Sequence, residues 1–185
     1  KTTSTVNIAA AIALTGPTVL VIDMDPQGNA STALGAVHHE GTPSVYEVLS
    51  GELTLADVIQ ACPDIPGLWA APATIDLAGA EIELVSQVAR EYRLARAIDA
   101  LLAFRHFDYI FLDCPPSLGL LTLNGLVAAR EVLLPIQCEY YALEGLGQLL
   151  RNVQLVQRNL NPRLELSAMV LVMYDARTKL ADQVV

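Results

Sequence analysis

Two carboxylates follow a short apolar run early in the chain. Asp23 and Asp25 come directly after the aliphatic run Val19–Ile22, and the turn-forming residues Pro26–Asn29 follow them. In an open α/β sheet, ligands bind beyond the carboxyl ends of the strands. A carboxylate buried there needs a cation or a hydrogen-bond donor. A single Asp would be read as a solvated turn residue, but the pair favours a metal and phosphate site.

A second apolar run also ends in an acid. Tyr109–Leu112 precedes Asp113, and a loop containing Pro and Gly follows over Cys114–Gly119. Taken alone, Asp113 would be a turn aspartate. Two strands that end in acids at equivalent places are harder to explain in that way. The pattern favours an aspartate of the Walker B type, which supports Mg²⁺ in nucleoside-triphosphate sites.

Lys1 and Thr2 stand directly before an alanine-rich stretch that continues to Leu14. This stretch is apolar nearly all round and therefore predicts a buried helix. A Lys-Thr pair at the start of a buried helix is also how the phosphate-binding loop G-x-x-x-x-G-K-[ST] ends. The dipeptide is common and means little alone. Its position, one helix before the strand that ends at Asp23, gives it value.

Apolar runs and helical patterns alternate along the rest of the chain. Strands are expected at residues 19–22, 68–71, 109–112, 132–136 and 166–173, and helices at 4–14, 76–104, 120–129, 144–160 and from 180 onward, with short capped helices opened by Ser44 and Thr54 and an apolar face at Leu94, Ile98, Leu101 and Leu102. This alternation predicts an α/β fold: a mostly parallel, doubly wound sheet with helices on both faces. We expect a single domain over residues 1–185.

Composition excludes several classes of protein. Hydrophobic residues make up 53% of the 185 and charged residues 17%, which is typical of a folded α/β domain and not of a disordered chain. No apolar stretch reaches the roughly 18 residues of a membrane span. The net charge of −9 argues against a strong nucleic-acid footprint on this stretch. The three cysteines form no CxxC pair and are expected to be reduced thiols.

These motifs resemble the ParA/MinD group of deviant Walker-type P-loop ATPases, and specifically the ParA (Soj-like) partition proteins. VLVIDMDPQGNAS is similar to the second motif of that family, and YIFLDCPPSLGLLTLNGL to its Walker B and switch region. LPIQCEYYALEGLGQLL and VMYDARTKLADQV are similar to later segments. MinD-type relatives typically have DSPAG where this chain has Asp113–Ser117. The fold implied is that of a P-loop NTPase, with ATP and Mg²⁺ as cofactors.

The resemblance implies roles for the residues at the start of the chain. Lys1 would be a point charge on the β- and γ-phosphates and hence catalytic. The Thr2 hydroxyl would be a ligand of Mg²⁺. Thr3 would approach the α-phosphate from the helix N-terminus, where backbone donors and the helix dipole favour anions.

The resemblance also implies roles for the acids and for the switch loop. Asp25 would orient the attacking water. Asp23 and Asp113 would hold the water molecules around Mg²⁺. Gly119 would let the switch backbone approach the γ-phosphate. Because such hydrolysis needs little covalent chemistry from the protein, it would depend on positioning and charge neutralisation.

The function implied is chromosome or plasmid partition by a slow ATPase. An ATP-bound homodimer would bind DNA non-specifically and be released by hydrolysis, which a ParB-like centromere-binding protein stimulates. The protein would be cytoplasmic and nucleoid-associated, without membrane attachment. The family's loop glycines, signature lysine, first strand and C-terminal part are not found in this sequence. We therefore expect a domain clipped at both ends, inactive alone, with most DNA contacts outside residues 1–185.

Three other functions remain open from the residues. A membrane-cycling division regulator of the MinD type would need a C-terminal amphipathic helix, and the Cys114–Pro116 sequence weighs against it. A small-molecule ligase of the dethiobiotin-synthetase type would need substrate-specific residues, which we do not identify. A nucleotide switch without turnover is the third. DNA binding that depends on nucleotide separates partition from the ligase, and liposome binding separates it from the membrane regulator.

Overall fold

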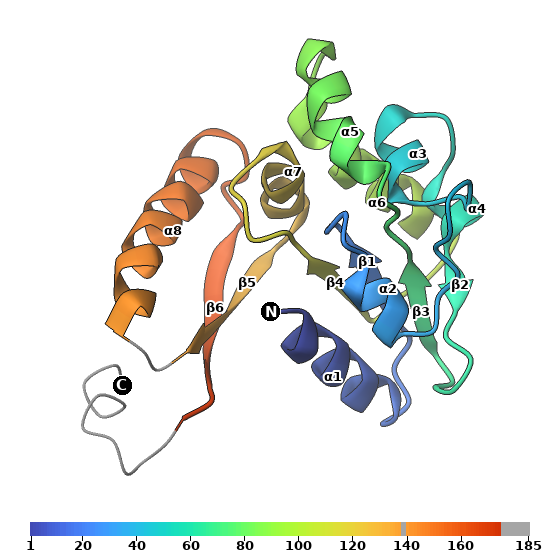
Figure 1. Cartoon of the computed structure of the whole chain (residues 1–185), viewed down its shortest axis with the longest axis horizontal. Coiled ribbons are helices and arrows are strands. Elements are labelled where there is room, and N and C mark those ends of the chain that lie inside the picture. The colour runs from blue at the N-terminus through green and yellow to red at the C-terminus, as the bar shows by residue number, and fades with distance from the viewer. Residues whose placement is uncertain (138–139, 175–185) are drawn as a thin grey trace. The chain divides into compact units, whose positions relative to one another are not determined.

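The computed structural model describes residues 1–137 and 140–174, which fall into two compact units, residues 1–128 and 129–174. The first unit contains α1 (Thr2–Ala13), β1 (Val19–Asp23), α2 (Asn29–Ala33), α3 (Val45–Ser50), α4 (Leu55–Val58), β2 (Gln60–Ala61), β3 (Leu68–Ala71), α5 (Leu77–Glu83), the 3₁₀ turns η1 (Leu84–Ser86) and η2 (Arg90–Tyr92), α6 (Arg93–Leu102), β4 (Tyr109–Asp113) and α7 (Leu120–Ala128). The second contains β5 (Glu131–Gln137), α8 (Tyr140–Asn159) and β6 (Glu165–Val172) (Figure 1).

The sheet of the first unit has the strand order β2-β3-β1-β4. β1 is central and pairs in parallel with β3 on one side and β4 on the other, whereas the two-residue β2 is antiparallel to β3. The register sets Asp23 opposite Asp113, and the Met24 N–H donates to the Asp113 carbonyl at 2.9 Å just beyond the strands. Both acids therefore lie at the same edge of the sheet.

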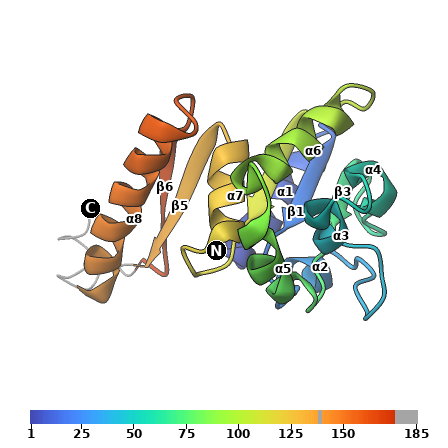
Figure 2. The same ribbon diagram turned by 90° about the horizontal axis from the view of Figure 1, so that it is seen from above.

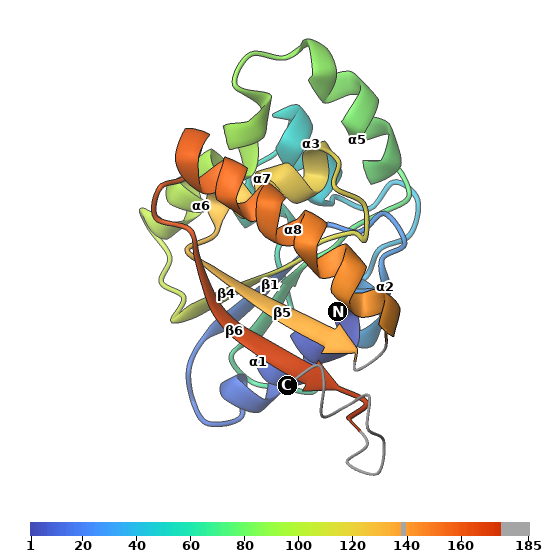
Figure 3. The same ribbon diagram turned by 90° about the vertical axis from the view of Figure 1, so that its left-hand side faces the viewer.

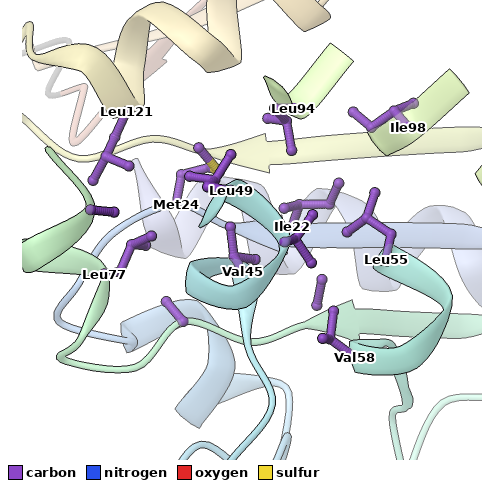
Figure 4. Close-up of a cluster of buried hydrophobic side chains, with 14 of the residues drawn as sticks. Ile22, Met24, Val45, Leu49, Leu55, Val58, Leu77, Leu94, Ile98 and Leu121 are labelled. Atoms are coloured by element: carbon purple, nitrogen blue, oxygen red, sulfur yellow. The ribbon is translucent and has the colours of Figure 1, made fainter. Parts of the chain in front are cut away.

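The alternating side chains of β1 pack into two separate cores. Leu20 and Ile22 join the larger core, most of whose other members come from the helices α3 to α7 (Figure 4). Val19 and Val21 face the smaller one, against α1 and the segment after α2. Figure 3 shows α1 on one side of β1 and β4, and α3, α6 and α7 on the other. Because these four side chains have no exposed surface, each stabilises the fold by roughly 1.5–3 kcal/mol.

The second unit is a parallel pair of strands with one long helix. β5 and β6 pair over their full length, with an irregularity between Val132 and Leu133. α8 lies along this pair (Figure 2) and buries Val153 and Val156. The Asn161 amide donates to the Ala129 carbonyl at 2.7 Å, which ties the end of α8 to the start of β5.

The predicted fold class is confirmed: helices and strands alternate, and the pairing is mostly parallel. The five predicted strands are present, as are the short helices at Ser44 and Thr54. Ser44 and Glu47 form a capping box, since the Tyr46 N–H donates to Ser44 Oγ and the Ser44 N–H donates to Glu47. The helix expected from residue 180 lies outside the described residues, and the single domain stays a prediction.

The continuous helix expected over residues 76–104 is wrong. The chain makes α5, two 3₁₀ turns and α6 in its place, and it breaks at Ala89, whose φ of 53° is left-handed. α6 buries Leu94, Ile98 and Leu101, but Leu102 is 43% exposed, because it falls one position beyond the buried stripe. α2 and β2 were not expected from the sequence.

The expected burial of the first helix is also only partly correct. α1 buries Ala9 and Ala13, while Thr3 and Asn7 are exposed. No helix in the described part of the chain has both the length and the apolar character needed to cross a membrane.

Candidate functional site

Asp23 ends β1, and donors from the chain surround its carboxylate. Oδ2 accepts hydrogen bonds from the Ser31 N–H at 2.8 Å and the Ser31 hydroxyl at 2.7 Å, and Oδ1 accepts from the Asp25 N–H at 3.1 Å. Ser31 Oγ in turn accepts from the Ala73 N–H at 3.0 Å. Burial raises the pKa of Asp23, and the bonds from Ser31 oppose that rise. The carboxylate therefore joins α2 and the segment after β3 to the end of β1.

Asp113 ends β4 beside Asp23, and one of its oxygens has no partner among the residues that the structure describes. Asp113 is 2% exposed, and its Oδ1 accepts from the Thr5 hydroxyl of α1 at 3.2 Å. Its Oδ2 is buried and accepts no hydrogen bond from the described residues. Leaving a buried acceptor unsatisfied costs about 1–3 kcal/mol. This oxygen is thus suited to a donor that the chain does not provide, such as water held by a metal ion.

Asp25 follows Asp23 but is partly exposed. Its Oδ1 accepts from the Gln27 N–H at 3.0 Å, and the Gly28 N–H donates to the Asp25 carbonyl at 2.9 Å. Gly28 has a φ of 63°, in the left-handed region, and a Cβ there would lie 3.0 Å from His38 Nδ1 and 3.2 Å from the Ala73 carbonyl. The turn Asp25–Gly28 is therefore fixed by its own hydrogen bonds and by a position that requires glycine.

The N-terminus of α1 opens on the surface. Lys1 is the N-cap residue, and no side chain caps the helix. The first backbone N–H groups of an α-helix lack partners within the helix, and together with the dipole they favour an anion. Thr2 and Thr3 line an open hollow there, together with Val6, Asn7, Asn29 and Ala33. Figure 1 shows this terminus close to the carboxyl end of β4.

The loop Cys114–Gly119 connects β4 to α7. The Thr122 hydroxyl donates to the Ser117 carbonyl at 2.6 Å, and the Leu123 N–H donates to the Gly119 carbonyl at 3.0 Å. The Glu81 carboxylate of α5 lies directly against Gly119, where a Cβ would clash with it, and it accepts from the Leu121 N–H at 3.4 Å. The loop is thus tied to α7 and to α5.

The structure brings most of the predicted site residues to one edge of the first unit. Asp23 and Asp113 are adjacent, Asp25 follows within two residues, and Thr5 links Asp113 to the first turn of α1. No interaction between Gly119 and Lys1 or Thr2 is found in the described part of the chain. The roles carried over to these residues stay predictions.

These residues fit ATP and Mg²⁺. Mg²⁺ is usually held by one or two protein groups together with substrate phosphates and water. Among residues 1–137 and 140–174, no three His, Cys, Asp or Glu side chains form a metal cluster, so a metal here would depend on the nucleotide. The free oxygen of Asp113 would accept a hydrogen bond from metal-bound water, and the uncapped start of α1 would receive a phosphate.

Sequence reasoning missed three residues: Thr5, Ser31 and Glu81. Thr5 lies one helical turn after Lys1, so its side chain could have been placed on the side of α1 that faces the strand ends. Ser31 and Glu81 reach their partners, Asp23 and Gly119, through the tertiary fold. No local pattern in the sequence marks them.

Ser31→Ala is expected to destabilise the first unit by about 1–3 kcal/mol, since it leaves the buried Ala73 N–H without an acceptor and removes one donor from Asp23. Because the pKa of Asp23 is raised in the folded state, the free energy of unfolding falls as the pH rises through that pKa. Ser31→Ala should raise the pKa of Asp23 further, so the loss of unfolding free energy should be larger at pH 7 than in acid. Chemical denaturation at both pH values measures this. Ser86→Ala, at an exposed serine, is the control.

Cys114 is expected to be a poor nucleophile, although it stands in the loop beside the site. Burial raises the pKa of its thiol to about 12, and a Cβ on Gly125 would lie only 2.6 Å from the sulfur. Only about one thiol in 10,000 is then ionised at pH 8. Peptide-resolved alkylation should label Cys114 and Cys62 (pKa about 11) only after unfolding. Rapid labelling of Cys114 in the folded protein would contradict the packing described here. Cys138 lies outside the described residues.

The chain is similar to known proteins over its whole length. The family described as "AAA domain" matches residues 1–166. Over 185 residues the chain is 50% identical to the sporulation initiation inhibitor protein Soj of Bacillus subtilis, covering all of this chain and 72% of that protein. It is 47% identical to the chromosome partitioning protein ParA of Caulobacter vibrioides, covering all of this chain and 68% of that protein.

A solved structure is similar in both sequence and fold. The structure titled cobyrinic acid a,c-diamide synthase from Mycobacterium smegmatis, with bound ATP analogue and magnesium, superposes with a TM-score of 0.90 at 43% identity. The match covers 99% of this chain and 74% of that one. ATP and Mg²⁺ are thus the cofactors of this fold and family. The chain belongs to the ParA (Soj-like) partition ATPases of the deviant Walker-type P-loop family.

Proposed function

We propose that ATP and Mg²⁺ bind where the start of α1 meets the carboxyl ends of β1 and β4. The observation that carries this site is the buried, unpartnered Oδ2 of Asp113, next to the uncapped helix. Lys1 binds the β- and γ-phosphates, Thr2 binds the metal, and Thr3 contacts the α-phosphate. Mg²⁺, when bound, neutralises charge on the phosphates. Asp113 and Asp23 accept hydrogen bonds from the water around it.

Asp25 then orients the attacking water. It is partly exposed, so solvent reaches it, and its turn holds it two residues beyond the buried Asp23. Gly119 brings the backbone of the loop to the γ-phosphate and so makes the loop responsive to hydrolysis. We propose slow turnover by the protein alone, since Lys1 and Asp25 are the only catalytic groups we assign in the described residues.

The biological task we propose is chromosome or plasmid partition in the cytoplasm, on the nucleoid. ATP assembles a homodimer that binds DNA without sequence preference, and a ParB-like centromere-binding protein stimulates hydrolysis and release. The names of the relatives, which describe chromosome partitioning, support this task. Because residues 1–185 carry a net charge of −9, any DNA contact that they make must come from a local basic cluster and not from their overall charge.

Retention of DNA of arbitrary sequence by the complete protein, in ATP and in ADP, tests this function. We expect ATP to increase retention by a factor on the order of 5–150, the range of typical coupling between two ligands. Retention should fall steeply with salt. Equal retention in ATP and ADP at each salt concentration would contradict the proposal.

A second candidate is an ATP-dependent enzyme that acts on a small molecule. It is favoured by the 43% identity to the structure titled as a diamide synthase. Both candidates use the same ATP site. The ATP-bound partition protein recognises DNA, whereas the ATP-bound enzyme recognises a small molecule. Nucleotide-dependent DNA retention supports partition, whereas ATP turnover that requires a small carboxylic acid and an amine donor, with no effect of DNA, supports the enzyme.

A further inference from the structure

Gly119 is covered by a side chain from another helix. The Glu81 carboxylate of α5 lies so close that a Cβ on Gly119 would clash with its Oε1 and lie 2.9 Å from its Cδ. Gly119 is not among the glycines with positive φ, so its backbone would accept alanine. A side chain at this position would therefore have to displace the Glu81 carboxylate.

The same carboxylate caps the start of α7. Its Oε1 accepts from the Leu121 N–H at 3.4 Å, and this N–H belongs to the first turn, where no intrahelical acceptor is available. An acid at a helix N-terminus is also favoured by the dipole. In most helices a residue just before the helix supplies this acceptor. Here an acid 40 residues upstream supplies it.

The contact lies beside the packed core. Leu77 and Ala80 of α5, Leu84 of η1 and Leu121 of α7 belong to one buried cluster, and Figure 4 shows Leu77 and Leu121 at the same end of it. Glu81 follows Ala80 directly in the sequence. Apolar side chains of both helices therefore share one core, and the carboxylate contacts the backbone at the point where the loop enters α7.

We propose that Glu81 is a positioning residue for the loop Cys114–Gly119: its carboxylate, seated against Gly119 and bonded to the Leu121 N–H, holds the end of the loop in place. Its effect on catalysis rests on the proposed function, in which Gly119 meets the γ-phosphate. Thr5 holds the other end of this segment through Asp113. The loop is then positioned at both ends by residues outside it.

Hydrogen exchange in the nucleotide-free protein tests the contact itself. Glu81→Ala should speed exchange of the Leu121 amide and its neighbours by about fivefold or more, because the amide loses its acceptor. Glu81→Gln, which keeps an acceptor oxygen, should restore most of the protection. Glu83→Ala is the matched control, since that carboxylate is two residues away on α5 and bonds the Tyr46 hydroxyl. Unchanged exchange in Glu81→Ala overturns the proposal.

A double-mutant cycle tests the same contact by a second route. Gly119→Ala should displace the carboxylate, so Glu81→Ala should lower the Tm less in the Gly119→Ala background than in the wild type. Full additivity of the two substitutions would mean that the side chain and the glycine act independently. That result would also overturn the proposal.

Nucleotide measurements separate positioning from a general loss of stability. Glu81→Ala should lower kcat and the preference for ATP over ADP while leaving ADP affinity unchanged, because ADP lacks the γ-phosphate that the loop meets. Glu81→Gln should recover the preference, and Glu83→Ala should not change it. An equal loss of ATP and ADP affinity would show a merely structural role. If the wild type bound no ATP, the proposed function would fail, while the exchange and the cycle would still decide whether Glu81 holds the loop.

Discussion

In the complete protein, Asp25→Ala is expected to remove ATP hydrolysis while leaving ATP binding nearly unchanged. The loss of one group that positions or deprotonates the attacking water commonly costs about 10²–10⁴ in rate. ATP affinity should persist, because the groups proposed to hold the phosphates and the metal, Lys1 and Thr2, lie at the start of α1 and are not altered. The ATP-bound, DNA-binding state should therefore accumulate. Single-turnover hydrolysis and nucleotide titration measure the two quantities separately.

Asp25→Asn sharpens this test, because an amide oxygen can still accept from the Gln27 N–H and preserve the turn. Both variants should be inactive if the carboxylate orients water. Activity in Asp25→Asn but not in Asp25→Ala would show that only the turn matters. Asp64→Ala is a suitable control, since Asp64 is exposed in the segment before β3, at the opposite end of the parallel strands. Unchanged turnover in Asp25→Ala would move the role to Asp23 or to water held by the backbone.

Lys1→Ala and Thr2→Ala should both weaken nucleotide binding, for different reasons. A hydrogen bond to a charged group contributes about 1.5–3 kcal/mol, so loss of the Lys1 charge should lower ATP affinity by about 10- to 100-fold at any Mg²⁺ concentration. Loss of the Thr2 hydroxyl removes a metal ligand, so its defect should shrink as Mg²⁺ is raised. Titrations of ATP at several Mg²⁺ concentrations measure this difference.

Thr2→Ser keeps the hydroxyl and should bind ATP as the wild type does. Equal ATP affinity in the wild type and Lys1→Ala would mean that Lys1-Thr2 is not the end of a phosphate-binding loop. A Thr2→Ala defect that is insensitive to Mg²⁺ would place the hydroxyl on the phosphates and not on the metal.

The strand ends of the first unit could be predicted from the sequence. Val19–Ile22 and Tyr109–Leu112 are short apolar runs that end in acids. Burial of a parallel strand on both faces produces such a run in β1, whereas β4 is only half-buried and exposes Tyr109. Their pairing places Asp23 opposite Asp113. The shared edge, and with it the candidate site, therefore follows from local composition and the rule for parallel sheets.

The partners of those acids could not be predicted, because they come from distant segments. Asp23 was expected beside the metal, yet three hydrogen bonds from Ser31 and Asp25 already reach its carboxylate. Glu81 meets Gly119 only after α5 and α7 pack into one core. The break of the helix at Ala89 could not be predicted either. Its neighbours in the sequence have good helix propensity, and tertiary packing overrides that preference.

The dependence of ATP binding on Mg²⁺, compared between the wild type and Asp113→Asn, tests the proposed site most directly. The asparagine can keep the bond from Thr5 on Oδ1 but replaces the free, buried Oδ2 with an amide donor. Groups that orient the ligands of a metal commonly change metal affinity by about 10- to 100-fold. We predict that Mg²⁺ strengthens ATP binding in the wild type and does so at least about tenfold less effectively in Asp113→Asn. The same Mg²⁺ dependence in both proteins would contradict the placement of the metal at this edge of the sheet.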